Sequence, residues 1–279
     1  MVDIEKICSG VYRGDYGIWY SDEKTKISYS DGGNRNCYSV EDRSFWFKHR
    51  NKCILELIKT FPPKNRGPIF DIGGGNGYVS SYIIDNGFKA VLVEPGFVGV
   101  HNAKKRGLEH IICACFQDIN FKPGSLPSVG LFDLLEHIED DSAFLSSLKS
   151  LLIPGGRLYI SVPAHPFLWS KNDSIAGHYR RYTTESLSRK LTAVGFQLDF
   201  STYIFRLLPL PIFLLRTIPS RLGLSRNDVN KRYVHRDHGV NNYLFGRLIA
   251  LALSSEIDNL RSKTAMMFGA SCLLVATNL

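Results

Sequence analysis

The stretch IFDIGGGNG, residues 69–77, decides the fold of this chain. It places an acid at position 71 and glycines at 73, 75 and 77 directly at the end of an apolar run. Glycine accepts a positive φ and lets a ligand approach the main chain with no Cβ in the way. The pattern therefore indicates a strand that turns sharply into a helix and exposes bare backbone to a nucleotide-like ligand.

Apolar runs alternate with helical patterns after this turn. Such alternation predicts an α/β fold, a doubly wound parallel sheet with helices on both faces and ligands at the carboxyl ends of the strands. The expected strands are residues 68–72, 89–93, 110–116, 129–134, 157–162, 197–205 and 271–277, and the expected helices are 76–86, 97–106, 141–152 and 183–195.

The flanking segments predict three parts. The first is expected to be a cap with β-rich runs over 17–30, an interruption of regular secondary structure at 31–34 and a helix from about 44 to 60. A segment of about sixty residues before the last strand is too long for an ordinary loop, so it is expected to be a partly helical insertion or lid. The three parts are the cap, 1–60, the core, 61–205 with 265–279, and the insertion, 206–264.

Composition limits the class of protein. A chain of 279 residues that is 44% hydrophobic can bury a full core. The net charge of +8 comes from scattered residues, which indicates a solvated surface more than a binding patch. The six cysteines form no CxxC pair, and no histidines stand beside them at zinc spacing, so we expect no metal site and a cytoplasmic location. The first residues do not resemble a secretory signal, and the apolar stretch 207–215 is too short to span a bilayer.

Acids follow the turn at the ends of successive expected strands. Glu94 is placed to accept both hydroxyls of a ribose, and Asp118 to accept the amine of an adenine. The alternative for each is a helix cap. A dinucleotide turn needs a third small residue, but Tyr78 or Ser80 occupies that position. Asp71 also suits a cationic ligand better than a pyrophosphate.

These motifs closely resemble those of the class I S-adenosylmethionine-dependent methyltransferases, in particular those that act on small molecules. The resemblance covers about 67–205 and 265–279 and rests on DxGxGxG at 71–77, Glu94, Gln117-Asp118 and FDLLEHI at 132–138. It implies a Rossmann-like seven-stranded sheet, mostly parallel, whose last strand is antiparallel and is preceded by the insertion.

The resemblance also implies the roles of individual residues. S-adenosylmethionine is the expected cofactor, with Glu94 at the ribose, Asp118 at the adenine and Arg50 at the carboxylate. Trp46 and Phe47 are expected to close over the sulfonium, or alternatively to pack on the core. The full expected cofactor set is Arg50, Asp71, Gly73, Gly75, Asn76, Gly77, Glu94, Gln117, Asp118, Leu134, Leu135 and Glu136.

The acceptor is expected to meet the segments 162–169 and 177–183. Arg180 and Arg181 are candidates to clamp an anionic group, or else one is exposed and the other ties the loop to the insertion. The expected acceptor-binding residues are Trp46, Phe47, His165, Arg180 and Arg181. The candidates for a general base are His137, His178, His165 and Tyr179, although His137 is equally suited to brace its loop.

The sequence therefore predicts an enzyme that methylates a small-molecule acceptor, lipophilic or anionic, by direct displacement. Nucleic acid is not the expected acceptor, because no base-flipping loop follows the strand at 129–134 and no basic run is interleaved with aromatics. The segment 207–226 suggests contact with a membrane surface, a lid or a homodimer. Two alternatives stay open: an NAD(P)-dependent oxidoreductase, and a non-catalytic protein that binds the cofactor or assists assembly.

Overall fold

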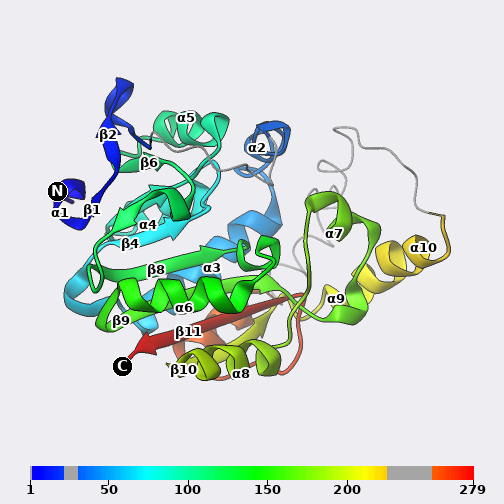
Figure 1. The fold of residues 1–279 in the computed structure, drawn as a ribbon. Helices are drawn as coiled ribbons and strands as arrows, with labels where there is room; N and C mark the ends of the chain where they lie inside the picture. The colour runs from blue at the N-terminus through cyan, green and yellow to red at the C-terminus, as the bar shows by residue number, and fades with distance from the viewer. Residues whose placement is uncertain (1, 22–30, 225–252) are drawn as a thin grey trace.

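The computed structural model describes residues 2–21, 31–224 and 253–279 (Figure 1). Its centre is a nine-stranded sheet in the order β10-β11-β9-β8-β4-β5-β6-β3-β2. In that order the strands are Phe196–Ile204, Ser271–Asn278, Leu152–Pro163, Leu126–Phe132, Ile69–Ile72, Ala90–Val93, Ile111–Cys113, Trp19–Ser21 and Val11–Arg13.

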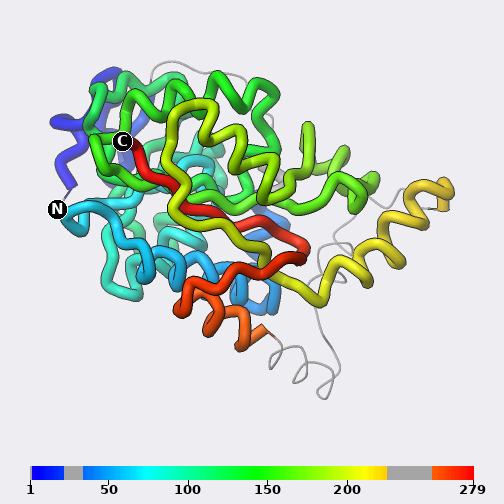
Figure 2. Tube along the Cα trace, turned by 90° about the horizontal axis from the view of Figure 1, so that it is seen from below, coloured from blue at the N-terminus to red at the C-terminus, as the bar shows by residue number. Residues whose placement is uncertain are grey.

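The predicted fold class is confirmed. Each of the seven expected strands is present, and β9, β8, β4, β5 and β6 run parallel to one another. The last strand, β11, lies antiparallel between β9 and β10 (Figure 2). The carboxyl ends of the parallel strands therefore meet at one edge of the sheet. The glycine turn directly follows β4 at this edge.

Helices cover both faces of the sheet, with α6 in front and α3 behind it in Figure 1. The alternation of side chains along β4 explains this, because successive residues point to opposite faces. Phe70 and Ile72 belong to the core beneath α6 and α8, whereas Ile69 belongs to the core beneath α3 and α4. The helices are α3 Phe45–Thr60, α4 Tyr78–Asp85, α5 Phe97–Lys105, α6 Asp141–Leu151 and α8 Thr184–Val194.

The N-terminal segment differs from the expectation in two respects. First, β3 pairs in parallel with β6 and β2 pairs with β3, so the segment extends the sheet from seven strands to nine. Second, the predicted interruption at 31–34 is wrong, because α2 begins there and covers Asp31–Tyr38. A helix tolerates glycine at a cost of about 1 kcal/mol each, and here α2 packs against α5. Residues 22–30 of the predicted β-rich run lie outside the described residues. A short helix α1, Ile4–Ile7, and a small sheet of β1, Cys8–Ser9, with β7, Asn120–Phe121, complete this end.

The insertion is described at its two ends. It begins with α9 Pro209–Ile212, a π-helical stretch Phe213–Thr217 and α10 Ile218–Arg221, which together extend away from the sheet in Figure 1. It ends with a helix over 253–261; the start of the helix predicted from 241 lies outside the described residues. None of the helices described is long and apolar enough to cross a membrane. The division into cap, core and insertion stays a prediction.

Candidate functional site

A cavity of about 440 Å³ lies at the carboxyl ends of β4, β5 and β8. It is open to solvent at one side and is built from the glycine turn, α2, α3, the loop after β8, and the start of the insertion. Its lining includes Asn34, Cys37, Glu41, Trp46, Phe47, Arg50, Asp71, Gly73, Gly74, Gly75, Asn76, Tyr78, Glu94, Asp133, Leu134, Glu136, His137, His178, Arg181, Ile212 and Arg216.

The turn at the wall of this cavity requires glycine, because side chains at Gly73 and Gly74 would collide with neighbouring residues. Gly73 has a φ of 69°, and a Cβ on it would lie 2.6 Å from Leu134 Cδ1. A Cβ on Gly74 would lie 2.4 Å from Leu92 Cδ1. The turn therefore brings main-chain atoms directly to the wall of the cavity, as the sequence predicts.

Glu94, which follows the neighbouring strand β5, binds the main chain of the glycine turn. Its carboxylate accepts hydrogen bonds from the Gly75 amide, at 2.9 Å, and from the Gly96 amide, at 2.8 Å. Burial raises the pKa of Glu94, while these two amides oppose the rise. The carboxylate lies where the sequence predicts a partner for a ribose.

Asp71 and Arg50 are two of the buried ionisable residues of the site. Asp71 is fully buried and accepts a hydrogen bond from the Ser80 hydroxyl at 2.7 Å. Burial raises the pKa of Asp71 to about 6. Its Oδ1 has no hydrogen-bond partner within the described part of the chain. Arg50 reaches the cavity from α3 and forms an ion pair with Asp133, which itself follows β8 with a φ of 57°.

The N-terminal segment contributes residues that the sequence did not reveal. The Asn76 side-chain amide donates to the Asn34 carbonyl at 2.9 Å and to the Glu41 carboxylate at 3.0 Å. Arg106 then pairs with Glu41 at 3.0 Å. No spacing rule identifies Asn34, Cys37 or Glu41, because they reach the cavity only through the packing of α2 over the glycine turn.

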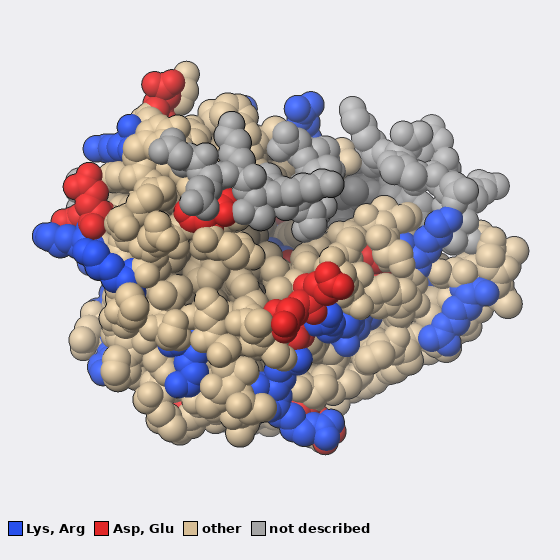
Figure 3. Space-filling view, viewed as in Figure 1, with Lys and Arg blue, Asp and Glu red and all other residues tan. Residues whose placement is uncertain are grey.

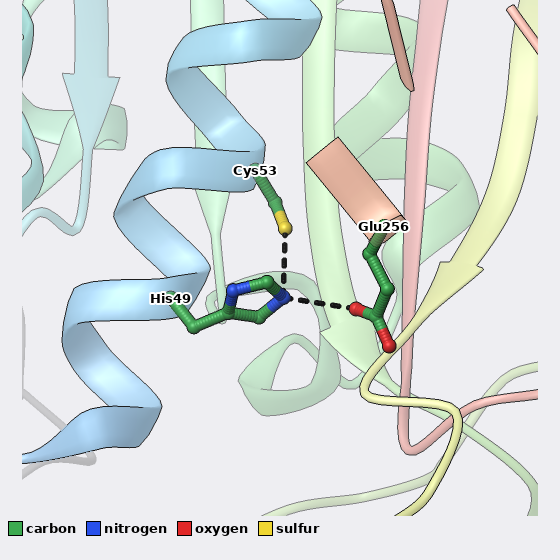
Figure 4. Close-up of side chains that lie close together, drawn as sticks. All are labelled: His49, Cys53 and Glu256. Carbon is green, nitrogen blue, oxygen red and sulfur yellow. Dashed lines mark hydrogen bonds and ion pairs between the residues drawn. The ribbon is translucent and has the colours of Figure 1, made fainter. Parts of the chain in front are cut away.

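The aromatic residues of α3 line the cavity and also pack on its surroundings. Trp46 stacks on Phe205 with ring centroids 3.9 Å apart, and Phe47 meets the edge of Tyr78 at 6.3 Å. The next turns of α3 are held by His49, whose Nε2 lies 2.9 Å from Glu256 and 3.3 Å from Cys53 Sγ (Figure 4). The position of Trp46 and Arg50 thus depends on a contact with the helix at 253–261.

Two histidines meet in the cavity from separate loops. The rings of His137 and His178 lie 4.8 Å apart and nearly perpendicular. Burial and the neighbouring His178 lower the pKa of His137 to about 4, so this imidazole is neutral at pH 7. His178 Nδ1 lies 3.1 Å from Asp173, which also pairs with Arg181 at 2.7 Å. Burial opposes ionisation of Asp173, but His178 and Arg181 together hold its pKa well below the usual range.

Other predicted residues lie outside the lining of the cavity. Arg180 pairs with Asp141 at 2.9 Å and donates to the Glu139 carbonyl. His165 stacks on Tyr203 at 4.8 Å. Tyr179 is half exposed. The others that do not line the cavity are Gly77, Leu135, Gln117 and Asp118. Of Arg180 and Arg181, the two arginines predicted to hold the acceptor, the structure therefore brings only Arg181 to the cavity.

Comparison with known proteins gives the context of this site. The profile of a family described as "Methyltransferase domain" matches residues 46–199. The ubiquinone biosynthesis O-methyltransferase of Xylella fastidiosa is 26% identical over 117 residues, which are 40% of this chain and 48% of that enzyme. The chain therefore spans about half the length of the curated relatives that it matches.

Solved structures share the fold at low identity. One is a chain of the complex that contains the Haloferax volcanii Trm112 methyltransferase activator, with a TM-score of 0.57, 16% identity and coverage of 89% of this chain and 95% of that chain. Another is the phosphoethanolamine N-methyltransferase 2 of Haemonchus contortus in complex with S-adenosyl-L-methionine, with a TM-score of 0.55, 17% identity and coverage of 90% and 58%. The match covers more than half of the sequence, and the chain therefore belongs to the methyltransferase domain family.

Proposed function

We propose that this protein transfers a methyl group from S-adenosylmethionine to a small-molecule acceptor by direct displacement. The observation that carries the proposal is a single cavity. It joins the glycine turn and Glu94 to a pair of histidines that come from two other loops.

The residues of the cavity suit this cofactor. The turn from Gly73 to Gly75 offers main chain without side chains, and Asp71 Oδ1 is a buried acceptor that has no donor within the described part of the chain. The carboxylates of Asp71, Glu94 and Asp133 favour a ligand that carries positive charge. In the proposed arrangement Glu94 holds the ribose and Asp118 remains the candidate for the adenine amine, although Asp118 is not in the lining.

The proposed chemistry needs little more than alignment. Bound S-adenosylmethionine supplies an electrophilic methyl on a sulfonium. The enclosing residues then align the acceptor and exclude water, which contributes roughly 7–11 kcal/mol in well-oriented reactions. Where the acceptor loses a proton, His178 is the better base of the two histidines, because its contact with Asp173 orients the ring. His137, which is neutral and more buried, is suited to position the acceptor.

The acceptor class is a finer part of the proposal. Ile212 and Arg216 bring the insertion to the cavity, so an acceptor with an apolar body and a polar reacting end fits this side. The curated relative named above acts in ubiquinone biosynthesis, which agrees with a lipophilic acceptor. Nucleic acid is a poorer fit, since Figure 3 shows basic side chains spread over the visible face with acidic ones between them.

The start of the insertion also supports a proposal about partners. Large apolar side chains are exposed there, among them Leu207, Leu210, Leu214, Leu215, Leu222 and Leu224. Arg206 precedes them and Arg221 lies among them, so we propose that 207–224 contacts an anionic membrane surface. A homodimer through the same residues is the competing outcome. Residues 225 and 226 of the segment lie outside the described part of the chain.

Two measurements test the proposed function. S-adenosylhomocysteine at about 100 times its Kd adds roughly 2.7 kcal/mol to the unfolding free energy, whereas NAD(P)H leaves it unchanged. Transfer of a labelled methyl from S-adenosylmethionine to a lipid or small-molecule extract then shows turnover. A thermal shift with NAD(P)H alone would indicate the oxidoreductase, and a shift with S-adenosylhomocysteine but no labelled product would indicate the non-catalytic binding protein.

A further inference from the structure

The cavity wall after β8 contains metal-ligating side chains that methyl transfer alone does not require. Glu136, His137 and His178 each bring one ligand atom to a common point, and these atoms lie within 4.8 Å of one another. All three residues line the cavity. We propose that they bind one divalent transition-metal ion, with Zn²⁺ the best match, and that this ion holds an oxygen of the acceptor.

Glu136 is the first reason. Its side chain is 1% exposed, and Oε2 has no hydrogen-bond partner within 2–21, 31–224 and 253–279. A buried carboxylate oxygen without a donor costs free energy, which a cation, a proton or a further hydrogen-bond donor recovers. A divalent ion at this point satisfies Oε2 and compensates the charge of the carboxylate.

The surroundings of the two histidines are the second reason. His178 places Nδ1 3.1 Å from Asp173 Oδ1, and the His137 side chain forms a hydrogen bond with the backbone of Gly177. Histidines that bind metals usually donate one ring N–H to a carboxylate or a carbonyl in this way, which fixes the ring and its tautomer. In a neutral imidazole the other nitrogen carries the lone pair that binds a metal.

The ligand set is the third reason. Two histidines and a glutamate hold catalytic zinc in several enzymes and leave a further position for water or substrate. At zinc–ligand bonds of about 2.0–2.2 Å, ligand atoms lie roughly 3.3–3.6 Å apart, so small side-chain rotations close the site. The nearby guanidinium groups do not oppose a cation, because Arg50 is paired with Asp133 and Arg181 with Asp173.

A second cluster in the molecule shows the contrast. His49, Cys53 and Glu256 also lie close together (Figure 4). There the Glu256 carboxylate already accepts the amides of Phe205 and Arg206, at 2.8 and 2.9 Å, and also contacts His49. Every carboxylate oxygen in that cluster has a donor, so it works as a structural contact and has no need of an ion.

The ion deepens the proposed function and, in its role toward the acceptor, rests on it. A bound ion lowers the pKa of a coordinated hydroxyl. The hydroxyl would then lose its proton to solvent. Its oxygen keeps the electron pair and forms the new bond to the methyl carbon, while the carbon–sulfur bond of S-adenosylmethionine breaks and S-adenosylhomocysteine leaves. Under this assignment His178 is a metal ligand and no longer the base. The acceptor is a compound that is methylated at an oxygen atom.

The test begins with ion binding to the chelator-treated full chain, without cofactor or acceptor. We expect one Co²⁺ per chain with visible d–d absorption, displaced by one Zn²⁺. The variants E136Q and H178Q should each weaken Co²⁺ binding by at least tenfold, and D173N by about tenfold through loss of ring orientation. The matched control is C53S, in the second cluster, which should bind Co²⁺ like the parent. Circular dichroism verifies that each variant is folded.

Three outcomes overturn the assignment. The first is that the parent protein shows no stoichiometric Co²⁺ binding. The second is that C53S loses Co²⁺ binding while E136Q retains it. The third is full methyl transfer by chelator-treated protein that holds no ion. The last result would leave the proposed function intact and return the role of base to His178. Stoichiometric binding that depends on Glu136 but comes with no methyl transfer would support the site and contradict the proposed function.

Discussion

At the scale of single residues, the site concentrates buried carboxylates. Asp71, Glu94 and Glu136 all lie in the cavity wall, and burial raises the pKa of each. Such groups cost stability when they ionise, so they are expected where a ligand compensates them. Their contributions to stability and to binding should therefore have opposite signs.

Asp71 gives the clearest prediction of this kind. Its folded pKa of about 6 exceeds the ordinary value of 3.8. Between pH 4 and 6 the unfolded chain then binds fewer protons, so this group lowers the unfolding free energy as the pH rises through that window. We expect D71N to be more stable than the parent at pH 7.5, by up to ~3 kcal/mol, and equal to it near pH 4. Urea unfolding at both values measures this.

The control for Asp71 is D199N, because Asp199 pairs with Arg157 at 2.6 Å and its removal should destabilise the protein at pH 7.5. If D71N is also destabilised at that pH, the Asp71 carboxylate is stabilised by partners and the reasoning from burial is wrong.

Glu94 should matter most for the cofactor. Under the proposed assignment, replacing Glu94 by Gln removes the charge that would accept the ribose hydroxyls, and each charge-assisted hydrogen bond contributes about 1.5–3 kcal/mol. We expect the Kd for S-adenosylhomocysteine, measured by calorimetry, to rise by tenfold or more. D118N makes the comparison: a similar rise would place Asp118 at the adenine, and an unchanged Kd in E94Q would refute the ribose assignment.

At the scale of elements, α3 carries part of the site and is held in place by a contact with the helix at 253–261. Its first two turns present Trp46, Phe47 and Arg50 to the cavity, and His49 in the same turns meets the helix at 253–261. Glu256 on that helix also accepts two amides after β10. The end of the insertion and the helix that lines the cavity are thus one packed unit.

We therefore expect E256Q to destabilise the protein by about 2–4 kcal/mol. The glutamine amide would face a buried N–H, which leaves donors without acceptors. The midpoint of urea unfolding reports the change. D258N, on the exposed side of the same helix, is the control and should stay within about 0.5 kcal/mol of the parent. An effect of that small size in E256Q would show that the contact does not hold α3.

At the scale of the whole molecule, the insertion joins the cavity to an exposed apolar surface. Ile212 and Arg216 line the cavity, while Leu210, Leu215 and Leu222 on the same segment are 65–73% exposed. The segment that we propose contacts a membrane therefore also contributes to the wall of the cavity.

If 207–224 contacts a membrane, the protein should co-sediment with vesicles that contain phosphatidylglycerol. Added salt should weaken binding, because Arg206 and Arg221 contribute by long-range attraction. The double variant L210E/L215E should lose vesicle binding by at least tenfold and retain its affinity for S-adenosylhomocysteine. Lack of vesicle binding at low salt, together with a dimer in sedimentation equilibrium that the same variant abolishes, would assign the surface to a homodimer.

The sequence by itself determined the doubly wound core and the position of the glycine turn. Each predicted strand of the core appears, because burial on a strand or a helix face imposes a local period that can be read residue by residue. The bounds are less well predicted, since β9 begins at Leu152 instead of 157 and β6 ends at Cys113 instead of 116. The acid at 94 could be placed for the same reason, since it directly follows β5, whereas the pair at 136–137 was placed by the family resemblance of the motif at 132–138.

Only the tertiary structure decided which residues meet. It paired Arg50 with Asp133, brought His178 to His137, placed Asn34 and Glu41 over the turn and joined His49 to Glu256. It also directed Arg180 away from the cavity and extended the sheet with β2 and β3. These contacts link loops and helices far apart in the chain, where no periodicity exists, and their partners are set by how the helices pack on the two faces of the sheet.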